Sequence, residues 1–165
     1  SRDYTVKIDV QNLQPGTYYY YRFEYQGNFS LTGRTKTAPT GSIDNLRFAV
    51  VSCSDYENGY FNAYESLNNR NDFDAVIHLG DYIYEYGVGT NIPGREHEPA
   101  NEIVTLGDYR GRFSHYKLDE QLRSLHQNYP FITIWDDHES ANNPWTGGAQ
   151  NHQPEKEGDW AARRA

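Results

Sequence analysis

Several kinds of residue are scarce in this 165-residue chain, and each scarcity narrows the class of protein. A single cysteine, Cys53, excludes an internal disulfide framework and leaves the redox compartment open. Only 15 Lys and Arg accompany 23 Asp and Glu, and the formal charge of -8 argues against a nucleic-acid surface built from basic residues. No apolar run is long enough to cross a bilayer, and no signal peptide is recognisable. Methionine is absent, so we expect a part of a longer gene product.

Residues 1–40 have the pattern of an antiparallel β unit. Apolar and polar residues alternate over 6–10, aromatic residues crowd 18–25, and a third stretch of strand character covers 31–37. Pro15-Gly16 predicts a tight turn between the first two, because proline presets φ and glycine accepts positive φ. The sequence therefore predicts three strands in this part of the chain.

The spacing Leu-x-Pro-Gly-Thr-x-Tyr-x-Tyr, from Leu13 to Tyr21, resembles the tyrosine-corner region of fibronectin III-like β domains. The resemblance implies that residues 1–40 are the C-terminal strands of such a domain. One face of these strands would then lack its partner sheet, which predicts self-association through an exposed apolar patch. The Pro-Thr-Gly-Ser segment at 39–42 is typical of a linker, and a second unit is expected at 45–165.

The second unit has a different hydrophobic period. It contains three short, continuous apolar stretches rich in β-branched or aromatic residues, which are typical of buried strands, at 46–51, 73–79 and 130–135. Helical periodicity lies between them, and this alternation favours a parallel sheet. Helices are expected over 60–67, 107–116, 119–128 and from about 158, with a long loop over 86–105. The predicted fold class is thus an α/β core of three parallel strands with helices, incomplete here, preceded by part of a β domain.

Candidate metal ligands follow each of these three strands. The first strand is followed by Cys53, the second by Asp81 and Tyr84, and the third by Asp137 and His138. Because the carboxyl ends of parallel strands meet at one edge of a sheet, we expect these side chains to converge. A lone Gly-Asp pair is more often an ordinary turn, and a lone cysteine is more often a small buried hydrophobe. Candidate ligands after three consecutive strands favour a metal centre over these ordinary roles.

The expected ligands suit two kinds of protein. Oxygen ligands hold hard cations, and Fe(III) also accepts a phenolate such as that of Tyr84. Two cations sharing a carboxylate would neutralise phosphate oxygens and lower the pKa of bound water, which suits hydrolysis of phosphate esters. A neighbouring imidazole would protonate the leaving alkoxide. The alternative is a non-catalytic cation-binding adhesion or interaction module, although a calcium site built only from oxygens has no use for the thiolate of Cys53.

Longer motifs resemble one family. They are Ser52-Cys53, the HLGDYIYE run from His78 to Glu85, LGDYR from Leu106 to Arg110, and WDDHE from Trp135 to Glu139. Together these motifs resemble the PhoD-type alkaline phosphatase/phosphodiesterases of the calcineurin-like metallophosphoesterase superfamily. That family also has a fibronectin-like β domain before its catalytic domain. The resemblance covers nearly the whole chain. It implies hydrolysis of phosphomonoesters and phosphodiesters at a multinuclear Fe(III) and Ca(II) centre, with other divalent cations as the alternative, in a protein exported to the periplasm or the extracellular space.

The same resemblance implies a role for each candidate residue. Cys53 would bind iron as a thiolate and Tyr84 would bind it as a phenolate. Asp81 would bridge the metals, and Asp137 would belong to the second, calcium site. His138 would face the phosphate as an acid or as a stabiliser of the transition state.

Other polar residues are weaker candidates. Asn142 is a candidate for a further oxygen ligand, and Arg110 and Arg112 are candidates for phosphate contacts, although arginines on an amphipathic helix are more often solvated or paired. The later histidine motifs of the family have no counterpart after Asn151, so we expect the C-terminal ligands to lie outside this chain. His78 is expected in the core, Asp136 is expected to point away from the site, and nothing singles out His97, His115, His126 or His152.

Overall fold

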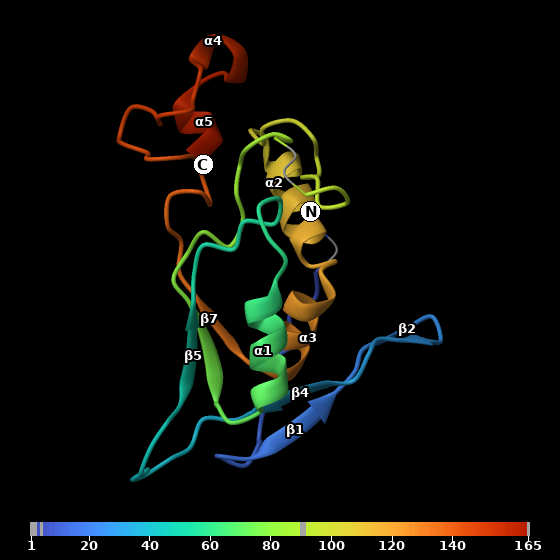
Figure 1. Cartoon of the computed structure of the whole chain (residues 1–165). Coiled ribbons are helices and arrows are strands. Elements are labelled where there is room, and N and C mark those ends of the chain that lie inside the picture. Colours follow the sequence, from blue (N-terminus) through green and yellow to red (C-terminus); the bar gives the residue numbers. More distant parts are fainter. Residues whose placement is uncertain (1–2, 4, 90–91, 165) are drawn as a thin grey trace.

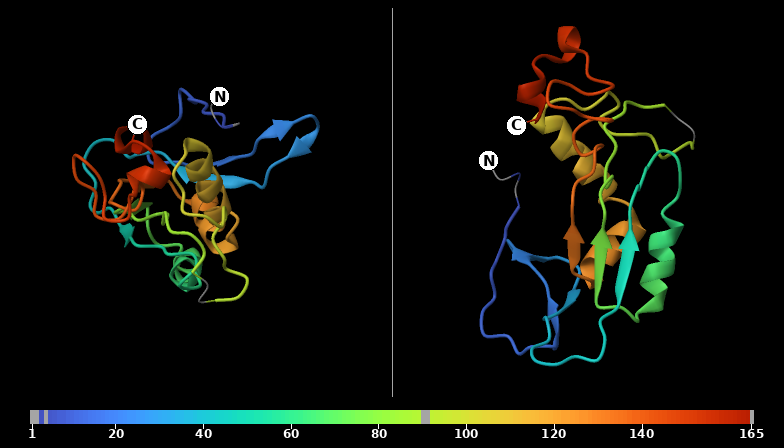
Figure 2. Two further views of the ribbon diagram at one scale, coloured as in Figure 1. Left: turned by 90° about the horizontal axis from the view of Figure 1, so that it is seen from above. Right: turned by 90° about the vertical axis from the view of Figure 1, so that its left-hand side faces the viewer.

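A three-stranded parallel sheet is the centre of the structure, a computed structural model that describes residues 3, 5–89 and 92–164. Its strand order is β5 (Phe48–Val51), β6 (Ala75–His78) and β7 (Phe131–Thr133). Both neighbouring pairs are parallel. The three strands point the same way, towards the end of the molecule where the long loops and the C-terminal helices lie (Figure 2).

Helices α1 (Asn62–Arg70) and α3 (Glu120–Asn128) cover one face of this sheet (Figure 1). The helices expected over 60–67 and 119–128 are present, with Tyr64 buried on α1 and Leu122 and Leu125 buried on α3. Asp119 caps the start of α3, and its carboxylate accepts hydrogen bonds from the Gln121 and Leu122 backbone N–H groups. Further helices are α2 (Leu106–Tyr116), the unpredicted α4 (Pro154–Glu157) and α5 (Trp160–Arg164).

The opposite face of the sheet is open, which corrects the expectation that the strands are buried on both sides. Ala49 and Val76 face the helices and are buried, whereas Phe48, Val50 and Ile132 remain 44%, 58% and 54% exposed. Successive strand residues point to opposite faces, so one face can be covered while the other is not. Within the described part of the chain, no element lies over the exposed side.

The N-terminal unit consists of two short antiparallel ladders. Strand β1 (Tyr18–Tyr21) pairs with β4 (Gly33–Lys36), and β2 (Glu24–Tyr25) pairs with β3 (Asn28–Phe29). The predicted strand over 6–10 is wrong: its residues have no strand structure, and Val6, Ile8 and Val10 are exposed. A strand needs a neighbour for its backbone hydrogen bonds, and no described segment pairs with this one.

The predicted fold class is confirmed: an α/β unit with three parallel strands follows a segment of antiparallel strands. The N-terminal unit rests on α3, where the Gln127 side chain donates to the Thr32 carbonyl oxygen at 2.6 Å. The predicted domain boundaries, 1–40 and 45–165, remain a prediction. Among the described residues, no helix combines the length and apolar character needed to span a membrane.

Candidate metal centre

The turns after β6 and β7 touch each other, and this contact requires a glycine. The backbone at Gly80 has φ +100°, and a Cβ placed there would lie 2.4 Å from the backbone nitrogen of Asp136. Asp81 follows with φ 51°, in the left-handed region that aspartate tolerates better than most residues. The chain after β5 is fastened to the same turn, because the N–H of Ser54 donates to the Asp81 carbonyl oxygen at 2.9 Å. All three strand ends therefore meet, as the sequence predicted.

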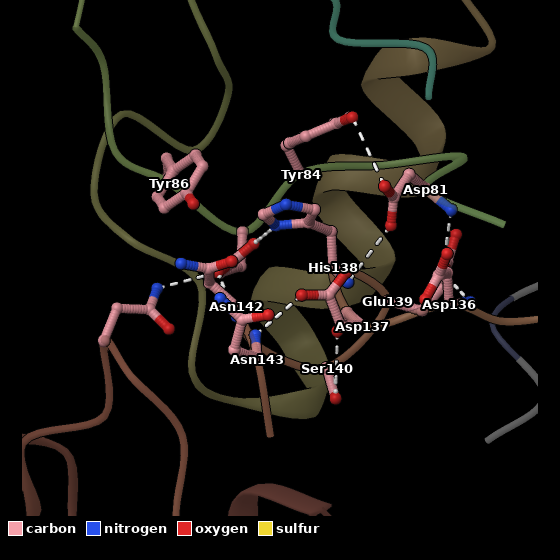
Figure 3. Close-up of polar contacts among 12 residues, drawn as sticks. Asp81, Tyr84, Tyr86, Asp136, Asp137, His138, Glu139, Ser140, Asn142 and Asn143 are labelled. Atoms are coloured by element: carbon pink, nitrogen blue, oxygen red, sulfur yellow. Dashed lines mark hydrogen bonds and ion pairs between the residues drawn. The ribbon is translucent and has the colours of Figure 1, made fainter. Parts of the chain in front are cut away.

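Asp81, Asp137 and His138 form the centre of the site (Figure 3). Each offers one ligand atom, and these atoms all lie within 4.8 Å of one another. Asp81 is buried, and burial raises the pKa of its carboxyl group above the ordinary value despite the N–H of His138, which donates to it at 3.3 Å. A nearby positive charge would stabilise the ionised form of this buried carboxylate. The ligand atoms of Asp81, Asp137 and His138 therefore suit a cation.

Cys53 and Tyr84 approach the same oxygen of Asp81. The Cys53 Sγ and the Tyr84 hydroxyl each lie 3.5 Å from Asp81 Oδ2. Burial, together with the charge on Asp81, raises the pKa of the Tyr84 hydroxyl. A thiol, a phenol and a carboxylate gathered at one point fit a ferric ion, which would favour the anionic form of all three groups. Cys53 is a free, exposed thiol rather than the buried hydrophobe that a lone cysteine most often is.

Asp137 and His138 are held by different partners. Asp137 Oδ2 accepts a hydrogen bond from the Asn143 backbone N–H at 2.6 Å. His138 Nδ1 lies 2.7 Å from Glu85 Oε2, and its ring packs beside the rings of Tyr84 and Tyr86 at centroid distances of 4.2 and 5.3 Å. Burial would lower the pKa of His138, but the Glu85 carboxylate outweighs it and raises the pKa above the ordinary value.

Two buried glutamates organise the site, and the sequence assigned no role to either of them. Glu85 is fully buried and contacts His138, whereas Glu139 accepts the backbone N–H groups of Asp81 and Asp136 at 3.0 and 2.8 Å. Both lie inside the quoted motifs. A signal was available for Glu139, because tight turns leave backbone N–H groups that need acceptors and a neighbouring acid can supply one. No local pattern pairs Glu85 with a histidine 53 positions away.

The weaker candidates lie farther from the centre. Asn142 reaches the site through its backbone N–H, which donates to Glu85 at 2.7 Å, while its side-chain amide donates to Gln150. Arg110 is half-buried on α2. Arg112 is fully buried and donates to backbone carbonyl groups of the loop after β6, so it has no access to a phosphate. His78 is confirmed as a core residue, with its Nε2 3.2 Å from the Tyr64 hydroxyl.

An open pocket of about 470 Å³ adjoins the Cys53 side of the site. Its wall combines polar groups such as Asp55 and Asn58 with the aromatic rings of Tyr60 and Phe61. A pocket with a few polar groups among apolar ones is the usual surrounding of a small-molecule site. The arrangement therefore combines a cation-binding corner, an imidazole of raised pKa and space for an organic group beside them.

Comparison with known proteins supports this interpretation. The family model described as "PhoD-like phosphatase" matches residues 48–165, and that of "PhoD-like phosphatase, N-terminal domain" matches residues 1–39. The chain is 41% identical over 146 residues to "Alkaline phosphatase D" of Bacillus subtilis (strain 168), covering 85% of this chain and 25% of that protein. It also matches a solved structure titled "Structure of PhoD" with a TM-score of 0.80 and 38% identity, over 93% of this chain and 30% of that one. The chain thus spans about a quarter of the curated relative's length.

Proposed function

Since this chain belongs to the PhoD-like phosphatase family, we propose that the strand ends around Asp81 form part of a phosphoesterase active site. The proposed substrates are phosphomonoesters and phosphodiesters. The observation that carries the proposal is the convergence of Asp81, Asp137 and His138, whose ligand atoms lie within 4.8 Å of one another. Carboxylates and an imidazole gathered at the edge of a parallel sheet are what metal-assisted hydrolysis requires.

The proposed ligands divide into two sets that share Asp81. Cys53, Tyr84 and Asp81 are the proposed ligands of Fe(III), because the Cys53 sulfur and the Tyr84 hydroxyl each lie 3.5 Å from Asp81 Oδ2. Asp137, with Asp81, is the proposed ligand set of Ca(II), and Asn142 would join it only if its amide turned away from Gln150. When bound, the cations would neutralise phosphate oxygens and lower the pKa of water.

His138 is the proposed general acid. Its Nδ1 is engaged by Glu85, so Nε2 is the ring atom available to the substrate. The raised pKa of His138 favours the protonated ring, and in that form Nε2–H can give its proton to the leaving alkoxide oxygen. The organic group of the ester would occupy the pocket beside Cys53. Arg110, on α2, is the proposed contact for a more distant phosphate oxygen.

A first test is metal binding by this chain. Loaded with iron, it should show the visible charge-transfer absorbance of a phenolate bound to Fe(III), and Tyr84→Phe should abolish that absorbance. Tyr86→Phe is the matched control, because Tyr86 packs beside His138 but has no contact with Asp81 among those found for the site. A phenolate-to-iron band that survives in Tyr84→Phe, as distinct from a thiolate-to-iron band of Cys53, would remove Tyr84 from the ligand set.

The second test is hydrolysis of an aryl phosphodiester in the presence of iron and calcium, by this chain and by a longer chain of the relative's length that contains it. Asp81→Asn should eliminate turnover. Asp136→Asn should retain it, because the Asp136 side chain is exposed and only its backbone N–H enters the network. Metal binding without turnover in both chains would favour the non-catalytic cation-binding module instead.

The proposal extends to the organisation of the chain. We propose two units, 1–40 and 45–165, and export to the periplasm or the extracellular space, as for the family that the motifs resemble. Self-association through the exposed aromatic residues of the N-terminal strands is also proposed, since Tyr20 and Tyr25 are 71% and 75% exposed. Sedimentation velocity should then show a dimer that Tyr20→Ser weakens, and a monomer at high concentration would contradict it.

A further inference from the structure

Glu85 is a fully buried carboxylate beside the site, and the proposed chemistry gives it no direct contact with substrate. Both of its oxygens are engaged. Oε2 lies 2.7 Å from His138 Nδ1, and Oε1 accepts the Asn142 backbone N–H and the Asn151 side-chain amide, each at 2.7 Å. Burying a charge this completely is costly unless every contact is favourable, so the arrangement requires an explanation.

The chemistry of the three partners fixes the direction of these hydrogen bonds. An ionised carboxylate only accepts, and a backbone N–H and a side-chain NH₂ group only donate. The one partner that can exist in two forms is the imidazole, and opposite a carboxylate it must carry hydrogen on Nδ1. In the neutral ring, Nε2 is then left without a hydrogen.

The ring of His138 is also restrained from its sides. The ring of Tyr84 lies 4.2 Å from it with an angle of 31° between the planes, and that of Tyr86 lies 5.3 Å away at 65° (Figure 3). The two tyrosine rings limit sideways movement of the imidazole. The hydrogen bond to Glu85 fixes the rotation of the imidazole about its Cβ–Cγ bond. Together they leave one orientation of the imidazole.

We propose that Glu85 is a positioning residue that keeps a proton on His138 Nδ1 in both the neutral and the protonated ring, so that Nε2 faces the phosphate ester and carries the proton that the general acid gives up. This inference rests on the proposed function of His138. Asn151 extends the arrangement, since its amide also donates to Glu102 at 3.0 Å, and Glu102 is paired with Arg163 of α5 at 3.0 Å. The C-terminal helix is thereby connected to the histidine through Asn151 and Glu85.

The test uses Glu85→Gln, which preserves shape but turns one oxygen into an NH₂ group. Two donors, the Asn142 N–H and the Asn151 amide, face the Oε1 position, so the single glutamine oxygen should stay there. Its NH₂ group would then face His138 Nδ1, which must become an acceptor. The expected result is a reversal of the tautomer, from Nδ1–H in the unmodified protein to Nε2–H in Glu85→Gln.

Nitrogen-15 NMR of the histidine rings reports this directly, because protonated and unprotonated ring nitrogens have well-separated shifts. Because Glu85 raises the pKa of His138 above the ordinary histidine range, spectra of the chain without added metal are recorded at rising pH until the His138 signals show the neutral ring. His138→Gln identifies the His138 signals by their disappearance. Glu139→Gln is the matched control, a buried glutamate of the same site that contacts backbone N–H groups and should leave the tautomer unchanged.

Each outcome decides the inference. A neutral His138 with hydrogen on Nε2 in the unmodified protein overturns it, whether or not Glu85→Gln folds. An unchanged Nδ1–H tautomer in a folded Glu85→Gln also overturns it. Reversal in Glu85→Gln with retention in Glu139→Gln supports it.

Turnover separates this inference from the proposed function. If His138 is the general acid, Glu85→Gln should lower kcat by about 10- to 100-fold with little change in KM, a typical loss for a carboxylate that orients a functional histidine. A KM effect with unchanged kcat would contradict the positioning role. Absence of hydrolysis in every variant, with the tautomer result as expected, would count against the proposed function and leave the geometry of the pair intact.

Discussion

Tyrosines in the two parts of this chain have opposite surroundings. In the N-terminal unit Tyr20 and Tyr25 are 71% and 75% exposed, whereas in the α/β unit Tyr116 and Tyr82 are 0% and 6% exposed. Each buried hydroxyl has a partner, since Tyr82 lies 2.8 Å from His126 Nε2 and Tyr116 lies 3.3 Å from a ring nitrogen of His97. Exposed tyrosines thus prevail in the N-terminal unit, whereas the α/β unit, although it exposes Tyr60, also buries tyrosines with hydrogen-bonded hydroxyls in its core.

Charged residues differ between the units in the same way. Arg22 of the N-terminal unit is exposed, with its guanidinium 4.1 Å from the centre of the Phe29 ring. Arg112 of α2 is fully buried. The difference shows that the costly burial of polar groups occurs in the α/β unit, where each such group needs partners to avoid destabilising the fold. Three predictions test how far this contrast holds.

The largest effect is expected from Arg112→Met. The guanidinium donates to the carbonyl oxygens of Glu98 and Pro99 at 3.0 and 2.8 Å and to Tyr86 at 2.9 Å, so its removal leaves several buried acceptors without donors. We expect the free energy of unfolding to fall by about 3–5 kcal/mol, as for other losses of a buried polar network. Urea unfolding followed by circular dichroism measures it.

Arg22→Met is the matched control for this experiment. An exposed cation–π contact contributes about 0.5 kcal/mol, so the midpoint of unfolding should hardly move. Equal losses in the two variants would contradict the contrast between the units. A small loss in Arg112→Met would mean that water can replace the guanidinium at the loop carbonyls.

A smaller, pH-dependent effect is expected at His126. Its ring stacks on Phe131 at 3.7 Å, and burial lowers the pKa of His126 from 6.5 to about 4. The unfolded chain therefore binds a proton below about pH 6.5 that the folded chain does not bind until about pH 4. The contribution of His126 to the free energy of unfolding is therefore fully present above pH 6.5. It declines as the pH falls, by about 2 kcal/mol at pH 5.

Substitution by glutamine isolates the contribution of His126. His126→Gln keeps an acceptor for the Tyr82 hydroxyl but cannot be protonated. The difference in unfolding free energy between the unmodified chain and His126→Gln should therefore shrink or reverse between pH 7 and pH 5, as the unmodified chain alone loses this stabilisation. If the unfolding free energies of the two proteins change with pH in parallel, the pKa of His126 is not lowered in the folded state.

Elements and site were predictable from the sequence to different degrees. The three strand ends were predicted correctly because hydrophobic period and the geometry of parallel sheets are local properties, and they placed Cys53, Asp81 and Asp137 together. The false strand over 6–10 has the right alternation, but alternation does not supply a hydrogen-bonding neighbour. Likewise, apolar composition could not show that Phe48 and Val50 lie on an uncovered face.

The supporting residues of the site were not predictable in the same way. Glu85 and His138 are 53 positions apart, and the pairing of β6 with β7 and the close turn at Gly80 bring their segments into contact. From its place on an amphipathic helix, Arg112 is expected to be solvated. It is buried by the loop after β6, whose conformation no hydrophobic periodicity in the sequence indicates. Ligands that follow strands are marked by local sequence, whereas the groups that orient them are defined by tertiary contacts.

The smallest effect is expected where the two units meet. Lys36 of β4 lies 2.7 Å from Asp74, which precedes β6, and the two side chains are 29% and 24% exposed. A partly exposed ion pair contributes about 0.2–1 kcal/mol, because water and salt screen the charges. Lys36→Met and Asp74→Asn should therefore show a coupling energy of that size in a double-mutant cycle, and it should shrink in high salt. Asparagine retains an acceptor for the Arg47 backbone N–H, so the cycle isolates the ion pair. A coupling well above 1 kcal/mol would mean that this contact resembles the buried networks around the site, and that the units are held together more firmly than their exposed boundary indicates.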